Sequence, residues 1–364
     1  MVFRKEECKN QKLQKLIGDT ESDQNLNKPE LIYFFKKMVK IAINGFGRIG
    51  RAFFRIAFER KGIDIVAIND LTDTKTIAHL LKYDSVFGLY DKKVEAGNGF
   101  IKVGGKKIIV FSEKEPENLP WNKLNVDVLV ESSGKFRSRD AAMRHLNAGA
   151  KKVLISAPGK NPDVTIVLGV NEKDLKKEHK IISMASCTTN CLAPVVKILN
   201  DSYGIKKGYM TTIHAYTGDQ NLVDSAHKDL RRARASAVNL VPTSSGAAVS
   251  VAEVIPSLKG KLDGLAVRAP VLCGSITDFV CVLKKSVSVE EVNNAIKQGS
   301  LKMKGILEYS DDDIVSSDIV KNSHSSIFDS KLTKVNGDFV KVFSWYDNEW
   351  GYSNRMVDFL SYLK

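Results

Sequence analysis

Long apolar runs are missing from this chain of 364 residues. No stretch approaches the ~20 consecutive apolar residues of a membrane-spanning helix, so we expect neither a transmembrane segment nor a membrane partner. Cysteine is also scarce: the five present are an odd number, and only Cys187 and Cys191 stand close together. This distribution argues against a disulfide framework and favours reduced thiols in a cytoplasmic protein.

Metal-ligand and nucleic-acid motifs are absent as well. No second cysteine or histidine pair at ligand spacing accompanies Cys187 and Cys191, so we predict no metal site. No zinc-finger, helix-turn-helix or RNA-recognition motif occurs, which argues against a nucleic-acid partner. Acidic residues are in deficit, with 42 Asp and Glu against 55 Lys and Arg and a net charge of +13. That excess indicates anionic partners, with phosphates and cofactors favoured over nucleic acid.

The length of the chain predicts two domains after an atypical N-terminus. Residues 1–38 are polar and carry charges of both signs, unlike a signal or transit peptide. We expect them to be an N-terminal extension, either disordered or the product of an upstream start codon. We expect a dinucleotide-binding domain over 39–186, a catalytic domain over 187–350, and a C-terminal helix over 351–364 that packs back on the first domain.

Strand and helix patterns alternate from Val39 onward, which predicts an α/β fold with a Rossmann-type parallel sheet. Strands are expected over 39–44 and 63–69, and helices over 48–60 and 74–82. After Cys187, longer alternating strands predict an α+β domain with a mainly antiparallel sheet. Further expected elements are a hairpin over 100–111 that turns at Gly104-Gly105, strands over 126–132, 152–158 and 164–170, a helix near 138–148, a capping box over Ser288–Glu291, a turn at Asn336-Gly337, and a final helix over 353–364 with Ser353 as its N-cap.

A glycine-rich turn follows the first predicted strand. The segment GFGRIG, residues 45–50, matches G-x-G-x-x-G, opens a predicted helix and precedes Asp70 at the end of the next strand. In this context Gly45 allows the tight turn, Gly47 lets the backbone approach a pyrophosphate, and Gly50 lets the helix pack on the strand. Asp70 would accept hydrogen bonds from the adenosine ribose and repel a 2′-phosphate, which favours NAD over NADP.

One cysteine has the surroundings of a nucleophile. Cys187 stands in the small, hydroxyl-rich stretch SMASCTTNC, directly after an apolar run, and His214 follows in the β-like run MTTIHAYT. A cysteine at a strand-to-helix junction with an imidazole nearby becomes nucleophilic near neutral pH. The alternative for any single cysteine is a small buried hydrophobe.

Several segments spread over the chain carry a family resemblance. They are INGFGRIGR, VAINDLTD, HLLKYDSV, ASCTTNCLAP, TTIHAYT, HKDLRRARA, PTSSGAA, LKGKLDGLAVRAP and WYDNEWGYSNR, and they cover essentially all of 39–364. In this order they resemble the phosphorylating glyceraldehyde-3-phosphate dehydrogenases. ASCTTN followed by TTIHAYT is the most specific pair.

The resemblance implies a reaction and two catalytic residues. Cys187 would attack the aldehyde to give a hemithioacetal and then a thioester, which inorganic phosphate splits. His214 would lower the pKa of the thiol and then act as base. The implied activity is oxidation and phosphorylation of D-glyceraldehyde 3-phosphate to 1,3-bisphosphoglycerate with reduction of NAD, a step of glycolysis and gluconeogenesis.

The resemblance also implies two phosphate sites and a cofactor site. Thr217 and Arg268 would bind the substrate's own phosphate, since guanidinium and hydroxyl groups match phosphate oxygens. The other implied contacts are Ser186, Thr188, Arg232, Ser245 and Gly246 for the attacking phosphate, and Gly45, Gly47, Arg48, Ile49, Gly50, Asp70, Lys114, Ser156 and Asn348 for NAD. Arg231 and Arg234, one or both, are expected to form surface ion pairs.

Three positions depart from the family pattern. Lys114 replaces a common arginine near the adenine, and Ser245 replaces a common threonine while keeping the hydroxyl. Ser225-Ala226 replaces Leu-Pro, in a loop that reaches a neighbouring subunit's cofactor in the family tetramer. Small or polar residues at that position resemble members that also accept NADP. We therefore expect a homotetramer that prefers NAD and uses NADP measurably.

Two other functions compete with this one. A relative could act on another phosphorylated aldehyde, such as erythrose 4-phosphate, with the same thiol. A silent binding protein on the same scaffold is the alternative outside enzymes, and the presence of Cys187, His214 and Arg268 argues against it.

Overall fold

The computed structural model describes residues 38–363, whose strands form a nine-stranded and a seven-stranded sheet. The prediction for the N-terminal extension lies outside these residues, apart from Met38. The first sheet is largely parallel and the second largely antiparallel, which confirms the predicted fold class.

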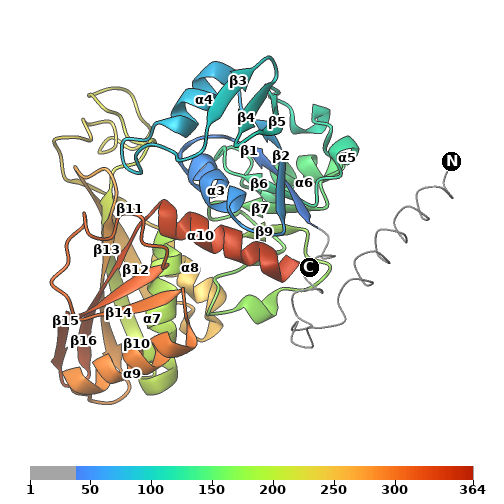
Figure 1. The fold of residues 1–364 in the computed structure, drawn as a ribbon. Helices are drawn as coiled ribbons and strands as arrows, with labels where there is room; N and C mark the ends of the chain where they lie inside the picture. The colour runs from blue at the N-terminus through green and yellow to red at the C-terminus, as the bar shows by residue number, and fades with distance from the viewer. Residues whose placement is uncertain (1–37, 364) are drawn as a thin grey trace, which may run out of the picture. The chain divides into compact units, whose positions relative to one another are not determined.

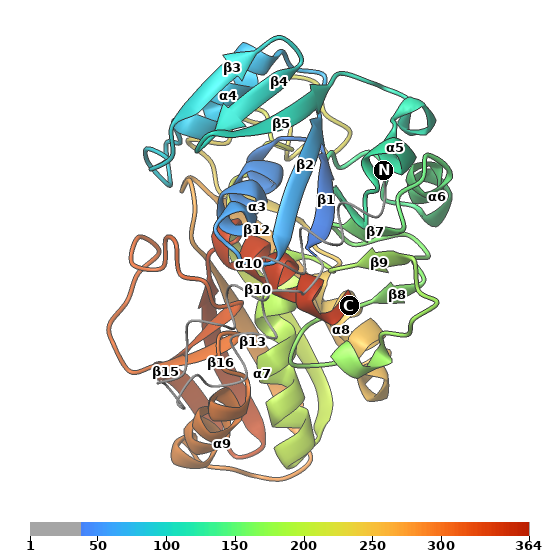
Figure 2. The ribbon, with the colours of Figure 1, turned by 45° about the vertical axis from the view of Figure 1, so that its right-hand side comes forward.

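The first sheet has the strand order β3-β4-β5-β2-β1-β6-β7-β9-β8 (Figure 2). Strand β1 lies between β2 and β6 and runs parallel to both, so the chain switches direction across the sheet at β1. Ligands of such sheets bind at the carboxyl ends of the strands beside that switch. The strands are β1 (Val39–Asn44), β2 (Ile63–Asn69), β3 (Val94–Gly97), β4 (Phe100–Val103), β5 (Lys106–Phe111), β6 (Val128–Glu131), β7 (Lys152–Ile155), β8 (Val164–Thr165) and β9 (Ile181–Ser183).

Helices cover both faces of this sheet, as the apolar strands require. In β1, Ile41 and Ile43 face one apolar cluster and Ala42 faces the other. The first cluster includes residues of α3 and α10, which lie side by side in Figure 1. The helices of this half are α3 (Arg48–Phe58), α4 (Thr74–Lys82), α5 (Trp121–Leu124), α6 (Arg139–Asn147) and α10 (Trp350–Phe359).

The second sheet has the order β11-β12-β10-β13-β16-β15-β14. Its strands alternate buried and exposed side chains, and the buried ones pack against α7, α8 and α9. The predicted Asn336-Gly337 turn joins β15 to β16, and Ser288 and Glu291 form the predicted capping box of α9. The elements are α7 (Cys187–Tyr203), β10 (Ile205–Ala215), β11 (Val241–Ser244), α8 (Ala247–Val254), β12 (Leu262–Ala269), β13 (Ser275–Leu283), α9 (Val289–Lys302), β14 (Leu307–Ser310), β15 (Ser326–Asn336) and β16 (Phe339–Tyr346).

The final helix begins earlier than predicted. It starts at Trp350, so Ser353 lies inside it and is not the N-cap. The carboxylate of Asp347 accepts hydrogen bonds from the backbone N–H groups of Glu349 and Trp350, at 2.9 and 2.7 Å. Those bonds satisfy amides at the start of the helix, so no serine cap is required there.

The strand predicted over 164–170 is reduced to Val164–Thr165. Asn171 folds back on the segment: its Oδ1 accepts from the Val167 amide, and its Nδ2 donates to the Thr165 carbonyl, both at 2.9 Å. These side-chain bonds compete with a strand ladder. Gly169 also has a φ of +82°, which a continuing strand would not contain.

Candidate active site

Cys187 is the first residue of α7, immediately after its N-cap Ser186. The Ser186 hydroxyl accepts from the Thr189 amide at 3.0 Å. Ala185 has a φ of +53°, a left-handed conformation that is rare without glycine and that turns the chain sharply into the helix. Asn190 holds this turn by donating to the carbonyls of Met184 and Ser186. The thiol therefore sits at the positive end of a helix, where an anion is stabilised.

Pro194 lies inside α7, beyond its first turn. The local cost of an interior proline is the loss of one helical N–H bond.

His214 and Arg268 are brought to the thiol by the second sheet. They are directly paired in the parallel strands β10 and β12, so both side chains lie on the same side of the sheet. His214 Nε2 lies 3.5 Å from Cys187 Sγ, and Arg268 Nη1 lies 2.9 Å from His214 Nδ1. The predicted pair of Cys187 and His214 is therefore assembled in the structure, with a guanidinium beside it.

The backbone orients the imidazole. His214 Nδ1 lies 2.6 Å from the Ala215 carbonyl oxygen, which can only accept a proton. Arg268 Nη1 lies 2.9 Å from the same nitrogen and can only donate, so the two contacts favour opposite tautomers of the ring. With the ring hydrogen on Nδ1, Nε2 is an acceptor that faces Sγ. Arg268 Nη1 donates to the same carbonyl at 3.3 Å. The arrangement is that of a thiol with its general base.

Burial and charge act in opposite directions on the thiol. Burial raises the pKa of Cys187, while the positive charge of Arg268 and hydrogen bonds from Thr188 act to lower it. The pKa of the free thiol lies above its ordinary value, opposite to the expected direction, because desolvation outweighs those charges. Burial, followed by the Arg268 charge, lowers the pKa of His214 to about 3. An imidazole with so low a pKa is free of a proton at neutral pH and is therefore available as a base.

The hydroxyl of Thr188 is occupied by a neighbour. It lies 2.8 Å from the hydroxyl of Tyr346, which also lies 2.9 Å from Thr212, and all three residues are buried. The Tyr346 ring packs edge-on against His214, with 5.8 Å between ring centres. The side chain of Thr188 thus contacts Tyr346 next to the thiol, and its role as a phosphate ligand stays a prediction.

The remaining residues predicted to bind phosphate lie in the segment between β10 and β11 and directly after β11. Thr217 follows β10, and its amide donates to the side chain of Gln220. Arg232 pairs with Asp219 and donates to Thr243 at 2.9 Å, so its guanidinium is already partly engaged. Ser245 and Gly246 stand at the start of α8, where Gly246 is the N-cap. Arg234 forms an exposed ion pair with Asp224, as expected of one of the flanking arginines.

The glycine turn between β1 and α3 fits a dinucleotide. Gly45 has a φ of +90°, and a Cβ there would lie 2.4 Å from the backbone of Ser133. A Cβ at Gly50 would lie 2.3 Å from the Gly45 carbonyl oxygen, whereas one at Gly47 would meet no atom of the described chain within 4 Å. Gly45 and Gly50 are thus required by packing, and Gly47 borders open space where a ligand could approach.

The start of α3 is left open to an anion. Within residues 38–363, no side chain caps this helix. By contrast, α4, α6, α7 and α9 have one side-chain cap each, which are Asp73, Ser138, Ser186 and Ser288 respectively. The first turn of α3 also contains no acidic residue. The free N–H groups and the helix dipole therefore suit a pyrophosphate. Asp70 accepts from the amides of Phe46 and Thr72, at 2.6 and 2.9 Å, and closes the adjacent end of β2.

The side chain of Arg48 is engaged within the chain. Its guanidinium donates to both carboxylate oxygens of Glu349 and to Asp84, and it lies over the ring of Phe87. The side chain is therefore committed to an ion-pair cluster, and only its backbone remains for a pyrophosphate. Glu349 directly follows Asn348, so this cluster ties the glycine turn to the segment expected at the nicotinamide.

The other residues predicted to bind the cofactor surround the same edge of the sheet. Ile49 packs on the core through its partly buried side chain, and Lys114 is exposed in the loop after β5. Ser156 follows β7, beside β6. Asn348 is buried, and its Oδ1 accepts from the Ser275 hydroxyl at 3.0 Å, so its Nδ2 is the end of the amide that can donate to a ligand.

Two family models match the chain. The NAD binding domain of glyceraldehyde 3-phosphate dehydrogenase matches residues 39–139, and the C-terminal domain of glyceraldehyde 3-phosphate dehydrogenase matches residues 186–348. This chain belongs to the glyceraldehyde-3-phosphate dehydrogenase family.

Curated relatives agree along nearly their whole length. The glyceraldehyde-3-phosphate dehydrogenase of Borreliella burgdorferi is 57% identical over 330 residues, which cover 88% of this chain and 98% of the relative. That of Mycobacterium avium is 57% identical over 332 residues, covering 89% and 98%. That of Geobacillus stearothermophilus is 54% identical over 328 residues, again covering 89% and 98%.

Some residues of the dehydrogenase site were missed from the sequence. Tyr346 and Asn190 shape the surroundings of Cys187, and Asp84 and Glu349 hold Arg48. Asn190 stands in the ASCTTN segment and Glu349 in WYDNEWGY, so the motifs themselves were a signal. Tyr346 stands in the same WYDNEWGY segment, but its contact with Thr188, 158 residues away in the sequence, could not be read from that segment.

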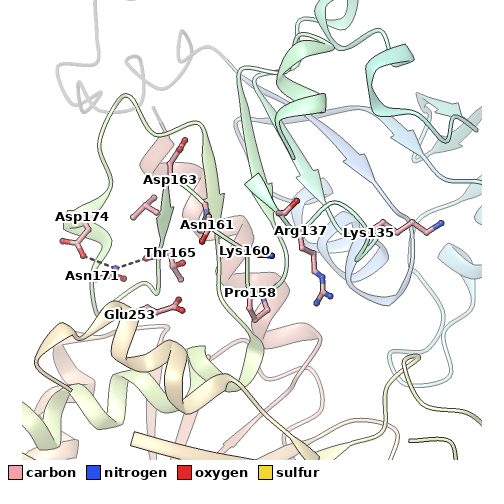
Figure 3. A pocket seen from close by; sticks show the side chains of 14 residues that line it. Lys135, Arg137, Pro158, Lys160, Asn161, Asp163, Thr165, Asn171, Asp174 and Glu253 are labelled. Carbon is pink, nitrogen blue, oxygen red and sulfur yellow. Dashed lines mark hydrogen bonds between the residues drawn. The ribbon is translucent and has the colours of Figure 1, made fainter. Parts of the chain in front are cut away.

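A cavity of about 880 Å³ lies among the loops that follow β6 and β7 (Figure 3). Lys135 and Arg137 line it from the loop after β6, Pro158 and Lys160 from the loop after β7, and Glu253 from α8. None of the residues predicted to bind substrate or cofactor lines it.

Among the described residues, no group of three or more His, Cys, Asp and Glu side chains could hold a metal ion, and no helix is long and apolar enough to cross a membrane.

Proposed function

We propose that this chain oxidises and phosphorylates D-glyceraldehyde 3-phosphate to 1,3-bisphosphoglycerate with NAD as hydride acceptor. The observation that carries the proposal is the 3.5 Å contact between Cys187 Sγ and His214 Nε2 beside Arg268. This thiol–imidazole pair stands in a chain whose dinucleotide turn is open to a pyrophosphate. The relatives bear the name of this activity.

The proposed chemistry begins with transfer of the thiol proton. His214 Nε2 accepts the proton as Cys187 Sγ attacks the aldehyde carbon, and the start of α7 and Arg268 stabilise the developing sulfur charge. The aldehyde oxygen takes up a proton, which gives a hemithioacetal. His214 then removes the hydroxyl proton while the hydride leaves the same carbon, and a thioester remains on Cys187.

NAD, when bound, supplies the hydride acceptor. This chain would hold it through Gly45, Gly47 and Gly50, the backbone of Arg48 and Ile49, Asp70, Lys114, Ser156 and Asn348. Inorganic phosphate then attacks the thioester carbon, the Cys187 thiolate leaves, and the product is an acyl phosphate.

Two anion sites flank the thiol in this proposal. Thr217 and Arg268 bind the substrate's phosphate. Ser186, the backbone of Thr188, Arg232, Ser245 and Gly246 bind the attacking phosphate. Supporting this assignment, Ser245 and Gly246 precede a helix that lacks a side-chain cap among residues 38–363.

A phosphate-dependence assay tests the activity. Reduction of NAD with D-glyceraldehyde 3-phosphate should require phosphate or arsenate, and kcat/KM for erythrose 4-phosphate should be lower. A higher kcat/KM for erythrose 4-phosphate would favour the related aldehyde dehydrogenase, and absence of turnover with either would favour a binding protein. Cys191→Ser is the control, since Cys191 is buried against Thr277 and Ser326, away from solvent.

We also propose NAD preference with measurable NADP use. Asp70 supports NAD because its carboxylate would repel a 2′-phosphate, whereas Ser225-Ala226 supports partial acceptance of NADP. The double variant Ser225→Leu/Ala226→Pro should lower kcat/KM for NADP and leave that for NAD within twofold. A wild-type preference for NADP would contradict the proposal.

A homotetramer in the cytoplasm completes the proposal. The segment 217–240 exposes large apolar side chains that a monomer would leave in water, namely Leu222, Val223, Leu230, Val238 and Leu240. The four cysteines of the described chain are free, which suits a reducing compartment. Light scattering should give four chains per particle, and a monomer would refute the assembly. The proposal includes three parts of the chain: a dinucleotide-binding domain over 39–186, a catalytic domain over 187–350 and a C-terminal helix over 351–364.

A further inference from the structure

A row of polar side chains is buried beneath the glycine turn, at the carboxyl ends of three neighbouring strands. Asn44 ends β1, Asn69 ends β2 and Glu131 ends β6, and their exposed fractions are 3%, 5% and 1%. Buried polar groups require hydrogen-bond partners, and here they are largely partners of one another. None of the three was predicted to bind the cofactor.

Glu131 is the centre of this row. Its Oε2 accepts from Asn44 Nδ2 at 2.5 Å and lies 3.2 Å from His145 Nε2. Its Oε1 accepts from the amide and the hydroxyl of Ser133, at 2.8 and 2.5 Å. Donors thus surround both oxygens, which makes a fully buried carboxylate tolerable at this point.

His145 is held in one tautomer. Trp121 Nε1 lies 3.3 Å from His145 Nδ1, and an indole N–H can only donate. Nδ1 is therefore an acceptor, and the ring proton lies on Nε2, facing the carboxylate of Glu131. Both His145 and Trp121 are completely buried, so this donor cannot be replaced by water.

The row extends towards Lys114, the residue proposed to lie near the adenine. Asn44 Oδ1 accepts from Asn69 Nδ2 at 2.7 Å. Asn69 in turn exchanges two hydrogen bonds of 2.9 Å with the backbone of Glu113. Asn44, Asn69 and the bonded Glu113 directly precede three residues of the proposed cofactor site, which are Gly45, Asp70 and Lys114.

The row also joins two turns that would form the walls of the proposed cofactor site, called the crevice below. One wall is the turn after β1, which begins at Gly45, and the other is the turn after β6, at Ser132 and Ser133. Glu131 bonds to Asn44 on the first wall and to Ser133 on the second, and the Ser132 hydroxyl donates to the Gly45 carbonyl at 2.7 Å.

We infer that Glu131 is a positioning residue for NAD, acting through Asn44 and Ser133 to hold the turns after β1 and β6 at the separation that the pyrophosphate needs. The inference rests on the proposed function, which supplies the cofactor. Glu131 does not touch the cofactor in this scheme. Its effect should therefore appear in affinity for the adenosine diphosphate part and not in the chemistry at Cys187.

Glu131→Gln keeps the size of the side chain and places an amide among donors. Whichever way the amide turns, its NH₂ faces either the Asn44 and His145 donors or the Ser133 donors, so one wall must shift. Small displacements of a positioned site cost large factors in binding. We expect the Kd for NAD, measured by calorimetry, to rise about tenfold or more, and the Kd for ADP-ribose to rise by the same factor. The kcat at saturating NAD and the alkylation rate of Cys187 without cofactor should stay within twofold.

Asp329→Asn is the matched control. Asp329 is a buried carboxylate as well. It accepts from the indole of Trp345 at 3.1 Å and lies in the second sheet. The variant Asp329→Asn should lose about as much thermal stability as Glu131→Gln, and its Kd values for NAD and ADP-ribose should not change. If Glu131→Gln does not fold, Trp121→Phe removes only the indole donor and should raise both Kd values about threefold.

An unchanged Kd for NAD in a folded Glu131→Gln would overturn the inference, as would equal Kd changes in Asp329→Asn. A rise for NAD without a rise for ADP-ribose would overturn it too, because the row lies at the adenosine diphosphate end. Failure of the proposed function gives a different result, since wild-type protein would then bind NAD without phosphate-dependent turnover or would not bind it at all.

Discussion

The dinucleotide turn and the thiol site are built in different ways. The turn is built from backbone. Because Gly45 and Gly50 have no side chain, other backbone atoms can lie close to them, and the uncapped start of α3 leaves its amides free for a ligand. The thiol site uses side chains from separate elements, with Cys187 on α7, His214 on β10 and Arg268 on β12. A site made of backbone should be sensitive to added atoms, whereas one made of side chains should be sensitive to removed groups.

Removal of the nucleophile should have the largest effect. Cys187→Ser replaces the thiol by a hydroxyl of much higher pKa, and we expect kcat to fall about 10⁴-fold or more. NAD affinity should remain, because the turn lies in the other sheet. Steady-state kinetics with calorimetry measure both, and retained dehydrogenase activity would refute the proposed mechanism. Cys191→Ser, on the same helix, serves as its control.

Loss of the base should come next. In His214→Asn the proton of the thiol has no acceptor at Nε2, so kcat should fall about 10² to 10⁴-fold. The pH dependence of kcat should also lose the step that belongs to the thiol–imidazole pair. His227→Asn is a comparison variant, since His227 lies in the loop over 217–240 and contacts Asp229. An equal loss in both variants would contradict a specific role for His214.

Two glycine substitutions separate packing from binding within the turn. In Gly45→Ala the new Cβ meets Ser133 backbone at 2.4 Å in a left-handed conformation, so we expect a loss of about 1–3 kcal/mol of unfolding free energy. In Gly47→Ala the Cβ meets no described atom within 4 Å, so stability should stay unchanged while the Kd for NAD rises. Thermal unfolding measures the stability of both variants, and calorimetry measures the Kd for NAD. Destabilisation by Gly47→Ala would contradict the prediction, because it would mean that the added Cβ does meet other atoms of the chain.

The charge of Arg268 should tune the thiol by a smaller amount. That charge lowers the pKa of Cys187 against the opposing effect of burial. Without it the thiolate is less stable, so Arg268→Gln should move the pH midpoint of Cys187 alkylation upward and slow alkylation below that midpoint, about tenfold per pKa unit. Arg234→Gln, at an exposed ion pair with Asp224, should leave the profile unchanged. A downward shift in Arg268→Gln would contradict the assigned sign.

Local patterns predicted the elements well. The strands over 39–44 and 63–69, the helix over 74–82 and the capping box at Ser288 have the predicted bounds or contacts, because each depends on neighbours within a few residues. The start of the last helix was wrong, since Asp347 supplies the caps that Ser353 was expected to provide. Competing local caps differ little in sequence and are decided by the path of the chain.

Side-chain partners were the hardest to predict. The guanidinium of Arg48 donates to Glu349, which lies 301 residues away in the sequence. The hydroxyl of Thr188 contacts that of Tyr346, 158 residues away. No local pattern contains either partner. The expected lowering of the thiol pKa failed for a related reason, because desolvation depends on packing around Cys187 that no local pattern contains.

The sequence by itself determined which residues the proposed chemistry uses. These are Gly45, Gly47 and Gly50, spaced between a strand and a helix, and Cys187 and His214 in their motifs. Tertiary structure decided what each of them faces. Strand pairing set His214 beside Arg268, burial set the pKa of the thiol, and Glu131 joined the walls of the crevice. The physical reason is that hydrogen-bond geometry and desolvation depend on distances between residues far apart in the chain, which exist only once the two sheets have packed.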